Sequence, residues 1–540
     1  MGIGRAAAAL RRTIDPKVVG GLGAVTIAAV VYSQFNLYGL LGRDAAIYVY
    51  GGQRFTHGVP PFASIMDPKG PISGILCGFG VAIARLAGHN DVLVIRAEFC
   101  AMSILAVLGI YLLVLEMWHS AIAGVVAAAV FTSFKMFAYD ALGGPDGHTP
   151  GIVFVIFALW LTVRRSWYWA GVAASLAFFS WQPLFFYPVI AFVCAIVWSP
   201  ERRRRAAGWS LAGLATPFVV LIVYYAAEGY IYNLFEGTFI FPLVGGYRPP
   251  VGFGDRLDWI FSNIPASYGS SAVLLWIGLL LLLAVAVWTV VSASENRRAA
   301  LTGPIVLLLL VSLLVQVAYV LYDYIGWTHA FPLLPYAAVG FGGAVALLLQ
   351  KVPSPQARRA TTATLVAAVT ALTVVCSIQY YQPSDDSNLR GELASACALQ
   401  RSLAPRTTLW VIDQPTPLVL LHRRNPDNYA FVGGGLAEWR VKHVRGGFAG
   451  WVLQIKARAS IVVLDSWRET IPIKQQLEYW LTAHYYRGFI GRWPVWVSRT
   501  ARATMAAHSI RLTHERHDWP LKTAGGTFRR TSCPRAPAGS

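Results

Sequence analysis

Apolar runs of roughly 20 residues recur along the first 380 positions of this chain, and a run of that length is what an α-helix needs to cross a lipid bilayer. Only 13% of the residues are charged and 56% are hydrophobic. In an ordinary soluble domain about a quarter of the residues are charged. These features exclude a soluble globular protein, and they predict a polytopic α-helical membrane protein.

The positions of the apolar runs and of the basic residues between them predict about eleven transmembrane helices. The basic loops include Arg164 with Arg165 and the quartet from Arg202 to Arg205. Because Lys and Arg accumulate in cytoplasmic loops, the N-terminus is expected in the cytoplasm and the C-terminus outside. The expected helices cover residues 18–41, 92–117, 120–139, 150–163, 166–181, 183–198, 209–227, 272–293, 303–322, 332–350 and 361–381.

The segment 71–88, PISGILCGFGVAIARLAG, is apolar enough to cross the membrane. Counting it as a span would place both basic clusters on the outer side, against the usual distribution of Lys and Arg. We therefore interpret it as a helix that lies in the outer interface or re-enters the membrane. The alternative is that this segment crosses the membrane and that another of the apolar runs does not.

Beyond residue 382 charged residues become frequent, and the runs TTLWVID, ASIVVLDS and VWVSR alternate with helical patterns such as GWVLQIKARA and IKQQLEYWLTAHYY. Alternation of this kind predicts a small α/β domain, which the topology places outside the cytoplasm. The expected organisation is a membrane domain over 1–382, whose first outer loop, 42–91, carries interfacial helices, an extracytoplasmic α/β domain over 383–520, and a disordered tail over 521–540.

Net charge and cysteine content give no support for a nucleic-acid-binding protein or a zinc-ribbon protein. The formal net charge is +19, but the basic residues of the membrane part sit in short clusters between apolar runs, which reflects topology, and no nucleic-acid partner is expected. The six cysteines lack CxxC spacing, which excludes a zinc ribbon. Cys397 and Cys533 either stay reduced or pair with each other in an oxidising compartment.

Ionisable residues in loops held against the membrane are the candidates for function, because charge near lipid is costly. The densest group is the first outer loop, GRDAAIYVYGGQRFTHGVPPFASIMDPKGP. Asp44 starts a helical pattern there, so it is either a first-turn carboxylate favoured by the helix dipole or a catalytic group. The charged and imidazole side chains of this loop are Arg43, Asp44, Arg54, His57, Asp67 and Lys69.

A second outer loop, YDALGGPDGHTPG, contains Asp140, Asp146 and His148, which the topology places on the same face as Asp44. Carboxylates and a histidine at one mouth can accept a proton from a hydroxyl or bind a divalent cation. The alternative is a Gly- and Pro-rich turn in which Asp146 is a turn residue.

Two later loops add basic candidates. In YDYIGWTHAFPLLPY, His329 precedes a helix that begins at Pro332, and helix N-termini attract anions such as phosphate. The loop from Glu228 to about Tyr268 is aromatic, partly apolar and contains Arg248. It either covers a lipid-linked substrate or is only an interfacial loop.

The first loop resembles that of the GT-C glycosyltransferases of the protein O-mannosyltransferase and lipid A aminoarabinose transferase type, glycosyltransferase families 39 and 83. The shared features are Asp44 soon after the first helix, the turn HGVPP and the box DPKGP, which matches D-x-K-x-P. The resemblance extends to Asp146 and to His329 ahead of PLLP. The sequence departs from the family at Ala45, where many members have Glu, and at Gly70, where proline is usual.

The resemblance implies a GT-C fold and a membrane domain that transfers a sugar, with inversion, from a polyprenyl-phosphate donor to an acceptor hydroxyl on the extracytoplasmic face. Asp44 would be the general base. The acceptor would be a protein, a lipid or a cell-wall glycan, in contact with the lipids of a bacterial plasma membrane. The resemblance implies no certain cofactor, and a divalent cation shared by Asp44 and Asp146, as in the more distant oligosaccharyltransferases, stays an open alternative. The residues expected to bind the donor phosphate or the substrate are Lys69, His329, Arg43, Arg54, His57 and Arg248.

A transporter or flippase of a lipid-linked substrate is the competing prediction, and it requires polar residues at mid-bilayer. The expected helices hold few of them: Arg96, Glu98 and Lys135 lie near helix ends, and Gln182 lies at a Pro-marked hairpin. A receptor that holds cell-wall polymer through the α/β domain is a third possibility, and it would leave the loop carboxylates dispensable. The clustering of charge on one face favours the enzyme.

Overall fold

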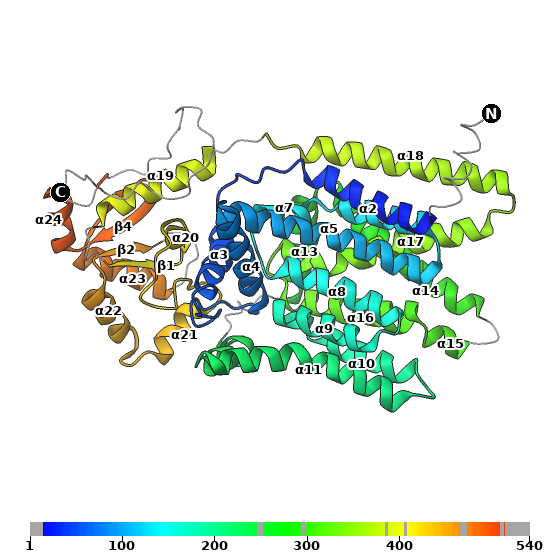
Figure 1. The fold of residues 1–540 in the computed structure, drawn as a ribbon, viewed down its shortest axis with the longest axis horizontal. Helices are drawn as coiled ribbons and strands as arrows, with labels where there is room; N and C mark the ends of the chain where they lie inside the picture. The colour runs from blue at the N-terminus through cyan, green and yellow to red at the C-terminus, as the bar shows by residue number, and fades with distance from the viewer. Residues whose placement is uncertain are drawn as a thin grey trace.

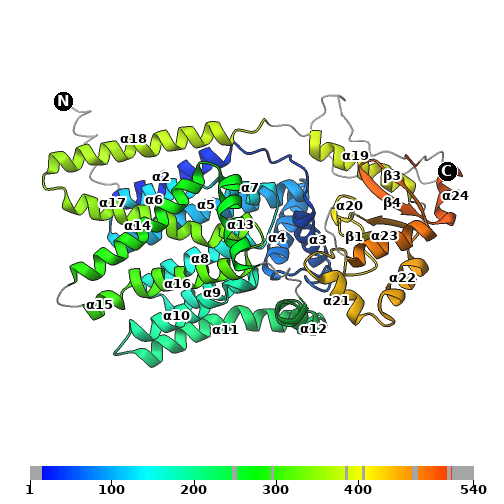
Figure 2. The same cartoon turned by 180° about the vertical axis from the view of Figure 1, so that it is seen from behind.

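The structure is a computed structural model that describes residues 15–245, 252–293, 297–383, 387–403, 408–464, 472–507 and 512–513. A long bundle of helices occupies one end of the molecule and an α/β region the other, with α3 (Arg43–Phe55) and α4 (Ile72–Ala87) between them (Figure 1). The reverse view shows the same order of parts (Figure 2). The first outer loop therefore lies where the bundle meets the C-terminal α/β region, which we define as residues 387–507.

The helices of the bundle closely follow the apolar runs. They are α2 (Pro16–Tyr32), α5 (Asp91–Trp118), α6 (Ala121–Thr132), α7 (Lys135–Gly143), α8 (His148–Val163), α9 (Trp167–Ser180), η1 (Gln182–Leu184), α10 (Phe186–Val197), α11 (Arg203–Ala227), α14 (Ser271–Ser292), α15 (Arg297–Leu301), η3 (Pro304–Leu310), α16 (Val311–Asp323), η4 (Trp327–Leu333), α17 (Leu334–Lys351) and α18 (Pro355–Tyr380). Between α11 and α14 lie α12 (Ile231–Phe235), η2 (Glu236–Gly245) and α13 (Phe253–Tyr268).

The bundle is that of a multi-pass membrane protein. Six of the described helices are long and apolar enough to cross a bilayer, and the bent pair α6 and α7 makes a seventh if it is one span. Shorter apolar helices are α2, α4, α8 and the segment formed by η1 and α10. The polytopic helical class is thus confirmed, and the count of eleven spans stays a prediction.

Two expected helices differ from the observed ones. The first ends at Tyr32 instead of residue 41, because the side chains of Ser33 and Gln34 both donate to the carbonyl of Val30 (2.8 and 2.9 Å) and so compete with the helix backbone. The helix expected over 120–139 is broken into α6 and α7, whose axes differ by 62°. At this break the hydroxyl of Ser133 turns back to the carbonyl of Val130 (2.7 Å).

The segment 71–88 forms α4, a helix of 16 residues that packs against α3 and α5. Figures 1 and 2 show α3 and α4 lying across the end of the bundle, at an angle to the long helices. Their buried side chains belong to the same hydrophobic cluster as the C-terminal α/β region. This arrangement favours the interfacial interpretation of α4 over a membrane span.

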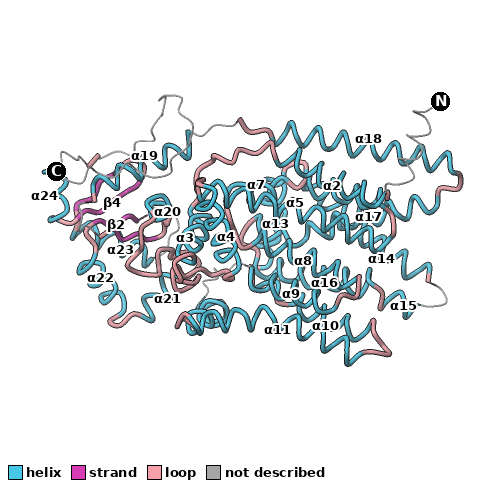
Figure 3. The backbone as a smooth tube through the Cα atoms, viewed as in Figure 1, coloured by secondary structure: helices cyan, strands magenta, loops and turns pink. Residues whose placement is uncertain are grey.

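A four-stranded sheet forms the centre of the C-terminal region, with the strand order β1-β2-β4-β3. Its strands are the magenta segments in Figure 3. β1 and β2 are parallel, whereas β4 pairs antiparallel with β2 and β3. Three strands were expected from the sequence; β3 was not, and the helix expected to reach Tyr486 ends at His484 because β3 follows it. The elements are α19 (Ser387–Ser402), β1 (Leu409–Ile412), α20 (Thr416–Leu421), α21 (Leu436–His443), α22 (Gly447–Arg458), β2 (Ile461–Leu464), α23 (Pro472–His484), β3 (Tyr486–Ile490), β4 (Trp493–Val497) and α24 (Arg499–Ala507).

The C-terminal region and the first outer loop are joined by backbone hydrogen bonds as well as by a common core. The amide of Met66 donates to the carbonyl of Asn428 (2.7 Å). The amide of Asn425 donates to the hydroxyl of Tyr50 in α3 (2.9 Å). These contacts fix the C-terminal region against the start of the membrane domain, although the two are more than 300 residues apart in the sequence.

Some predictions fall at or beyond the edges of the described residues. Cys397 is disulfide-bonded, whereas Cys533 and the tail 521–540 lie outside the described residues. Arg248 also lies outside them. The free cysteines of the described part are Cys77, Cys100, Cys194 and Cys376, all in apolar helices as expected.

Candidate functional site

A cavity of about 1450 Å³ opens between the loops of the bundle and the C-terminal region. Loops far apart in the sequence meet at its wall: the start of α3, the DPKGP box, the turn before α8, and the segment η4 ahead of α17. The bundle contributes Arg43, Asp44, Lys69, Asp140, Asp146, His148, Trp181 and His329 to the lining, and the C-terminal region contributes Glu392, Gln414, Arg492 and Trp493.

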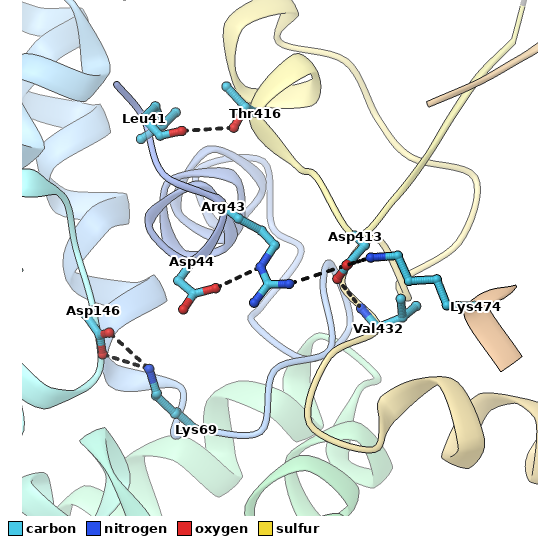
Figure 4. A network of polar contacts seen from close by, with 9 residues as sticks. All are labelled: Leu41, Arg43, Asp44, Lys69, Asp146, Asp413, Thr416, Val432 and Lys474. Atoms are coloured by element: carbon cyan, nitrogen blue, oxygen red, sulfur yellow. Dashed lines mark hydrogen bonds and ion pairs between the residues drawn. The ribbon is translucent and has the colours of Figure 1, made fainter. Parts of the chain in front are cut away.

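Asp44 lies in the first turn of α3, where the helix dipole favours a carboxylate. Its side chain is 57% exposed, and its Oδ1 accepts a hydrogen bond from the Nε of Arg43 (3.2 Å) (Figure 4). The turn that carries Asp146 packs directly on this helix, since a Cβ added to Gly144 would lie 2.3 Å from the Cβ of Ala45. Ala45, where many members of the family have Glu, thus lies at a close contact between the first outer loop and the loop that carries Asp146. We call these the two acidic loops.

Lys69 and Asp146 form the central ion pair of the cavity. The ammonium group lies 3.0 Å from each carboxylate oxygen. Both contacts are drawn as dashed lines in Figure 4. Burial lowers the pKa of Lys69, but the carboxylates of Asp146, Asp44 and Asp67 more than reverse this effect, so its pKa is raised above the ordinary value. This raised pKa favours the charged ammonium form of Lys69 at the cavity wall.

Asp146 is held by its own loop as well as by Lys69. Its Oδ1 accepts the backbone amide of His148 (2.9 Å) and lies 2.8 Å from the Nδ1 of that histidine, while its carbonyl accepts the hydroxyl of Ser73 (3.0 Å). Burial raises the pKa of Asp146, but His148 and Lys69 outweigh burial and hold this pKa well below its usual range. The carboxylate is ionised and fixed in place.

His148 and His329 stand in an aromatic wall of the cavity. The ring of Trp181 lies 4.6 Å from that of His148 and 5.5 Å from that of His329, and Tyr319 stacks on His329 at 6.2 Å. The two imidazoles are 6.4 Å apart and nearly buried. This wall is suited to hold an apolar or sugar group close to polar donors.

Asp140, Asp146 and His148 offer three donor atoms within 4.8 Å of one another, a set that can hold a metal ion. Asp44, which the sequence suggested as a ligand together with Asp146, is not a member of this group. Lys69 already contacts both oxygens of Asp146, so a cation bound here would have to displace that ammonium group. The residues permit a metal, but the lysine opposes it.

Three sequence candidates stand apart from this group. Arg54 and His57 do not line the cavity, because they follow Asp44 by about three helical turns and lie roughly 15 Å further along the direction of α3. The Nδ1 of His57 lies 2.7 Å from the carbonyl of Gln53. Arg248 lies outside the described residues.

Arg96, which the sequence placed near the end of a helix without a role, is fully buried and organises the two acidic loops. Its guanidinium donates to carbonyls of two segments. One segment leads to Asp44, and the other is the end of α7, which precedes Asp146. A buried Arg in an apolar helix is itself a functional signal. The four acceptors are the carbonyl oxygens of Leu37 (2.6 Å), Gly39 (2.9 Å), Leu40 (2.8 Å) and Gly143 (2.9 Å).

Asp67 of the DPKGP box gives the site a pH-dependent component. Burial raises its pKa from 3.8 to about 6, against the opposing effect of Lys69. The folded protein thus binds this proton more tightly than the unfolded chain, and stability falls as pH rises from 3.8 to about 6. The melting temperature of Asp67→Asn minus that of wild type should therefore be larger at about pH 8 than at about pH 4. A difference that is the same at both pH values would contradict this prediction.

No protein-family model matches the chain, and neither does any curated protein sequence. Solved structures do match. The crystal structure of ArnT from Cupriavidus metallidurans bound to undecaprenyl phosphate aligns with a TM-score of 0.57 over 88% of this chain and 97% of that chain, at 13% identity. This chain has the fold of ArnT. The ArnT structure in the apo state aligns over the same shares with a TM-score of 0.55, at 12% identity.

A third structure, the S. cerevisiae protein O-mannosyltransferase Pmt1-Pmt2 complex bound to the sugar donor, aligns over 41% of this chain and 34% of that chain. Its TM-score is 0.33 at 16% identity, so the fold assignment does not depend on it. The GT-C fold implied by the first-loop motifs is confirmed by ArnT.

Proposed function

We propose that this protein is an inverting glycosyltransferase that moves a sugar from a polyprenyl-phosphate donor to an acceptor hydroxyl. One observation carries the proposal: the exposed carboxylate of Asp44 and the ion pair of Lys69 with Asp146 line one cavity of a chain with the fold of ArnT. ArnT, a lipid A aminoarabinose transferase, was crystallised with undecaprenyl phosphate, which supports a lipid phosphate as the donor's leaving group.

Asp44 is the general base of the proposed reaction. The acceptor oxygen attacks the anomeric carbon from the side opposite the phosphate, the bond from that carbon to the phosphate oxygen breaks, and the hydroxyl proton passes to the carboxylate. Arg43 donates to Oδ1, and the exposed side chain of Asp44 lines the cavity, where the acceptor would reach the other oxygen, Oδ2. General-base catalysis of this kind typically contributes about 10² to 10⁴-fold.

Lys69 stabilises the departing polyprenyl phosphate. The reaction leaves negative charge on the phosphate, and an ammonium group with a raised pKa at the cavity wall is suited to bind it. Asp146 holds this ammonium group in place through two contacts of 3.0 Å. His329 lies at the same wall and would add a polar donor beside the phosphate.

The orientation of the chain completes the proposal: the cavity and the C-terminal region face the extracytoplasmic side of a bacterial plasma membrane, and the N-terminus faces the cytoplasm. The acceptor is a hydroxyl of a protein, a lipid or a cell-wall glycan that reaches the cavity from that side. Membrane lipids surround the bundle, and the expected division at residue 382 separates the membrane domain from the extracytoplasmic one.

Cysteine labelling tests the orientation. Arg203→Cys, in the exposed start of α11, and Tyr479→Cys, on the exposed face of α23, should react with a membrane-impermeant maleimide from opposite sides of the membrane. In intact spheroplasts only Tyr479→Cys should be labelled, and permeabilisation should expose the other. The wild-type chain is the background control. Labelling of Arg203→Cys in intact spheroplasts would contradict the orientation.

A transfer assay tests the activity. The purified protein in lipid nanodiscs is given a panel of radiolabelled polyprenyl-phosphate sugars together with envelope fractions as acceptors. We expect release of free polyprenyl phosphate with label transferred to the acceptor, and competition by unlabelled undecaprenyl phosphate. Movement of intact donor across a vesicle membrane without cleavage would instead indicate the transporter.

A further inference from the structure

Four charged side chains of alternating sign run from the C-terminal region to the wall of the cavity. The ammonium group of Lys474 lies 2.7 Å from the Oδ2 of Asp413, and the same oxygen lies 3.4 Å from the Nη1 of Arg43. The Nε of Arg43 lies in turn 3.2 Å from the Oδ1 of Asp44. Figure 4 shows the row from Lys474 to Asp44 in one view.

Asp413 is a rigid member of this row. It directly follows β1, at the end of a strand parallel to β2, and its side chain is 0% exposed. Its Oδ1 also accepts the amide of Val432 (3.5 Å). A carboxylate buried this deeply is tolerated only with cationic partners, and it has two: Lys474 within its own region and Arg43 from α3.

Arg43 transmits this rigidity to Asp44. Its guanidinium group contacts Asp413 with one nitrogen and Asp44 with another, and its carbon lies 5.1 Å from the ring centre of Phe431 in the C-terminal region. A planar guanidinium held at three points has a fixed direction. Asp44 is 57% exposed, so the burial that normally fixes a side chain does not orient its carboxylate, and the contact with Arg43 sets its direction.

We propose that Asp413 is a positioning residue for sugar transfer: through Arg43 it fixes the direction of the Asp44 carboxylate, so that the C-terminal α/β region completes the catalytic site. The inference rests on the proposed role of Asp44. It also changes the role expected for Arg43, from a ligand of the donor phosphate to the link between two carboxylates.

The double variant Asp413→Asn with Lys474→Gln tests the proposal. Removing Asp413 alone would leave the buried ammonium of Lys474 without this partner and could unfold the region, whereas the double variant removes both charges. Asn also suits the backbone of residue 413, whose φ is +64°, a conformation that Asn and Asp adopt more readily than most residues. We expect kcat to fall about 10 to 100-fold with the KM for donor unchanged, because the base is misplaced while the donor site is intact.

The matched control is Asp427→Asn with Arg440→Gln. This pair is also largely buried in the C-terminal region, at 3.1 Å, but it is not part of the row that ends at Asp44. It should lower the melting temperature about as much as the test variant while kcat stays at the wild-type value. Arg43→Lys is a second test variant, because lysine keeps the charge but cannot contact both carboxylates with separate nitrogens as the guanidinium does. Its kcat should fall to a similar extent.

A folded double variant with wild-type kcat, or one in which only the KM for donor rises, would overturn the proposal. Asp44→Asn, measured in the same assay, separates this failure from a failure of the proposed function. If Asp44→Asn retains full activity, the proposed function is wrong. If Asp44→Asn is inactive but both test variants keep wild-type kcat, only the positioning role of Asp413 is wrong.

Discussion

Asp44→Asn should lower kcat for sugar transfer by about 10² to 10⁴-fold, the usual contribution of a general base. Asn is almost isosteric with Asp and can still accept the hydrogen bond from Arg43, but its amide cannot take the acceptor's proton. Because the Asp44 side chain is 57% exposed, its replacement should leave the melting temperature within a few degrees of wild type. The measurement is the initial rate of polyprenyl phosphate release under saturating donor.

Asp255→Asn is the matched control for this variant. Asp255 also lies in the first turn of a helix, α13, and is exposed, but it does not line the cavity. It should transfer sugar at the wild-type rate. Activity of Asp44→Asn within a few-fold of wild type would remove Asp44 from the mechanism and with it the proposed reaction.

Replacing Arg96 should have the second large effect, on stability and activity together. Arg96→Gln removes the buried guanidinium that donates to four carbonyls of the two acidic loops, and a hydrogen bond to a charged group typically contributes about 1.5 to 3 kcal/mol. The loops ahead of Asp44 and Asp146 would then move independently, so kcat should fall as well. Arg96→Lys should be intermediate, because its ammonium group cannot reach carbonyls on both sides as the guanidinium does.

Thermal unfolding in nanodiscs, combined with the transfer assay, checks the order wild type, Arg96→Lys, Arg96→Gln. Arg85→Gln is the control, since Arg85 is an exposed arginine at the end of α4. It should match wild type in both measurements. Arg96→Gln with a wild-type melting temperature would show that these hydrogen bonds do not hold the loops together.

The bundle could be predicted from the sequence because a membrane-spanning helix is recognised by the length and composition of its apolar run, and both are local properties. Asp44, Lys69, Asp146 and His329 were also predictable as neighbours, since alternating topology places the loops that carry them on one side. The break between α6 and α7 was not, because a hydroxyl that competes with helix carbonyls, here that of Ser133, leaves the apolar pattern unchanged.

The parts of the site that were missed depend on distant contacts. Asp413 meets Arg43 across 370 positions of sequence, and no local pattern marks such a pair. In the opposite direction, Arg54 and His57 were grouped with Asp44 because they are close in sequence, although α3 carries them away from the cavity. Proximity along a chain predicts proximity in space within one or two helical turns only.

The most direct measurement is a cryo-EM structure of the protein in nanodiscs with undecaprenyl phosphate. The proposed function predicts the phosphate in the cavity within hydrogen-bonding distance of Lys69, with the carboxylate of Asp44 facing the position of the departing sugar. Phosphate density at the other face of the membrane, or in a site that Lys69 and Asp44 do not reach, would contradict it.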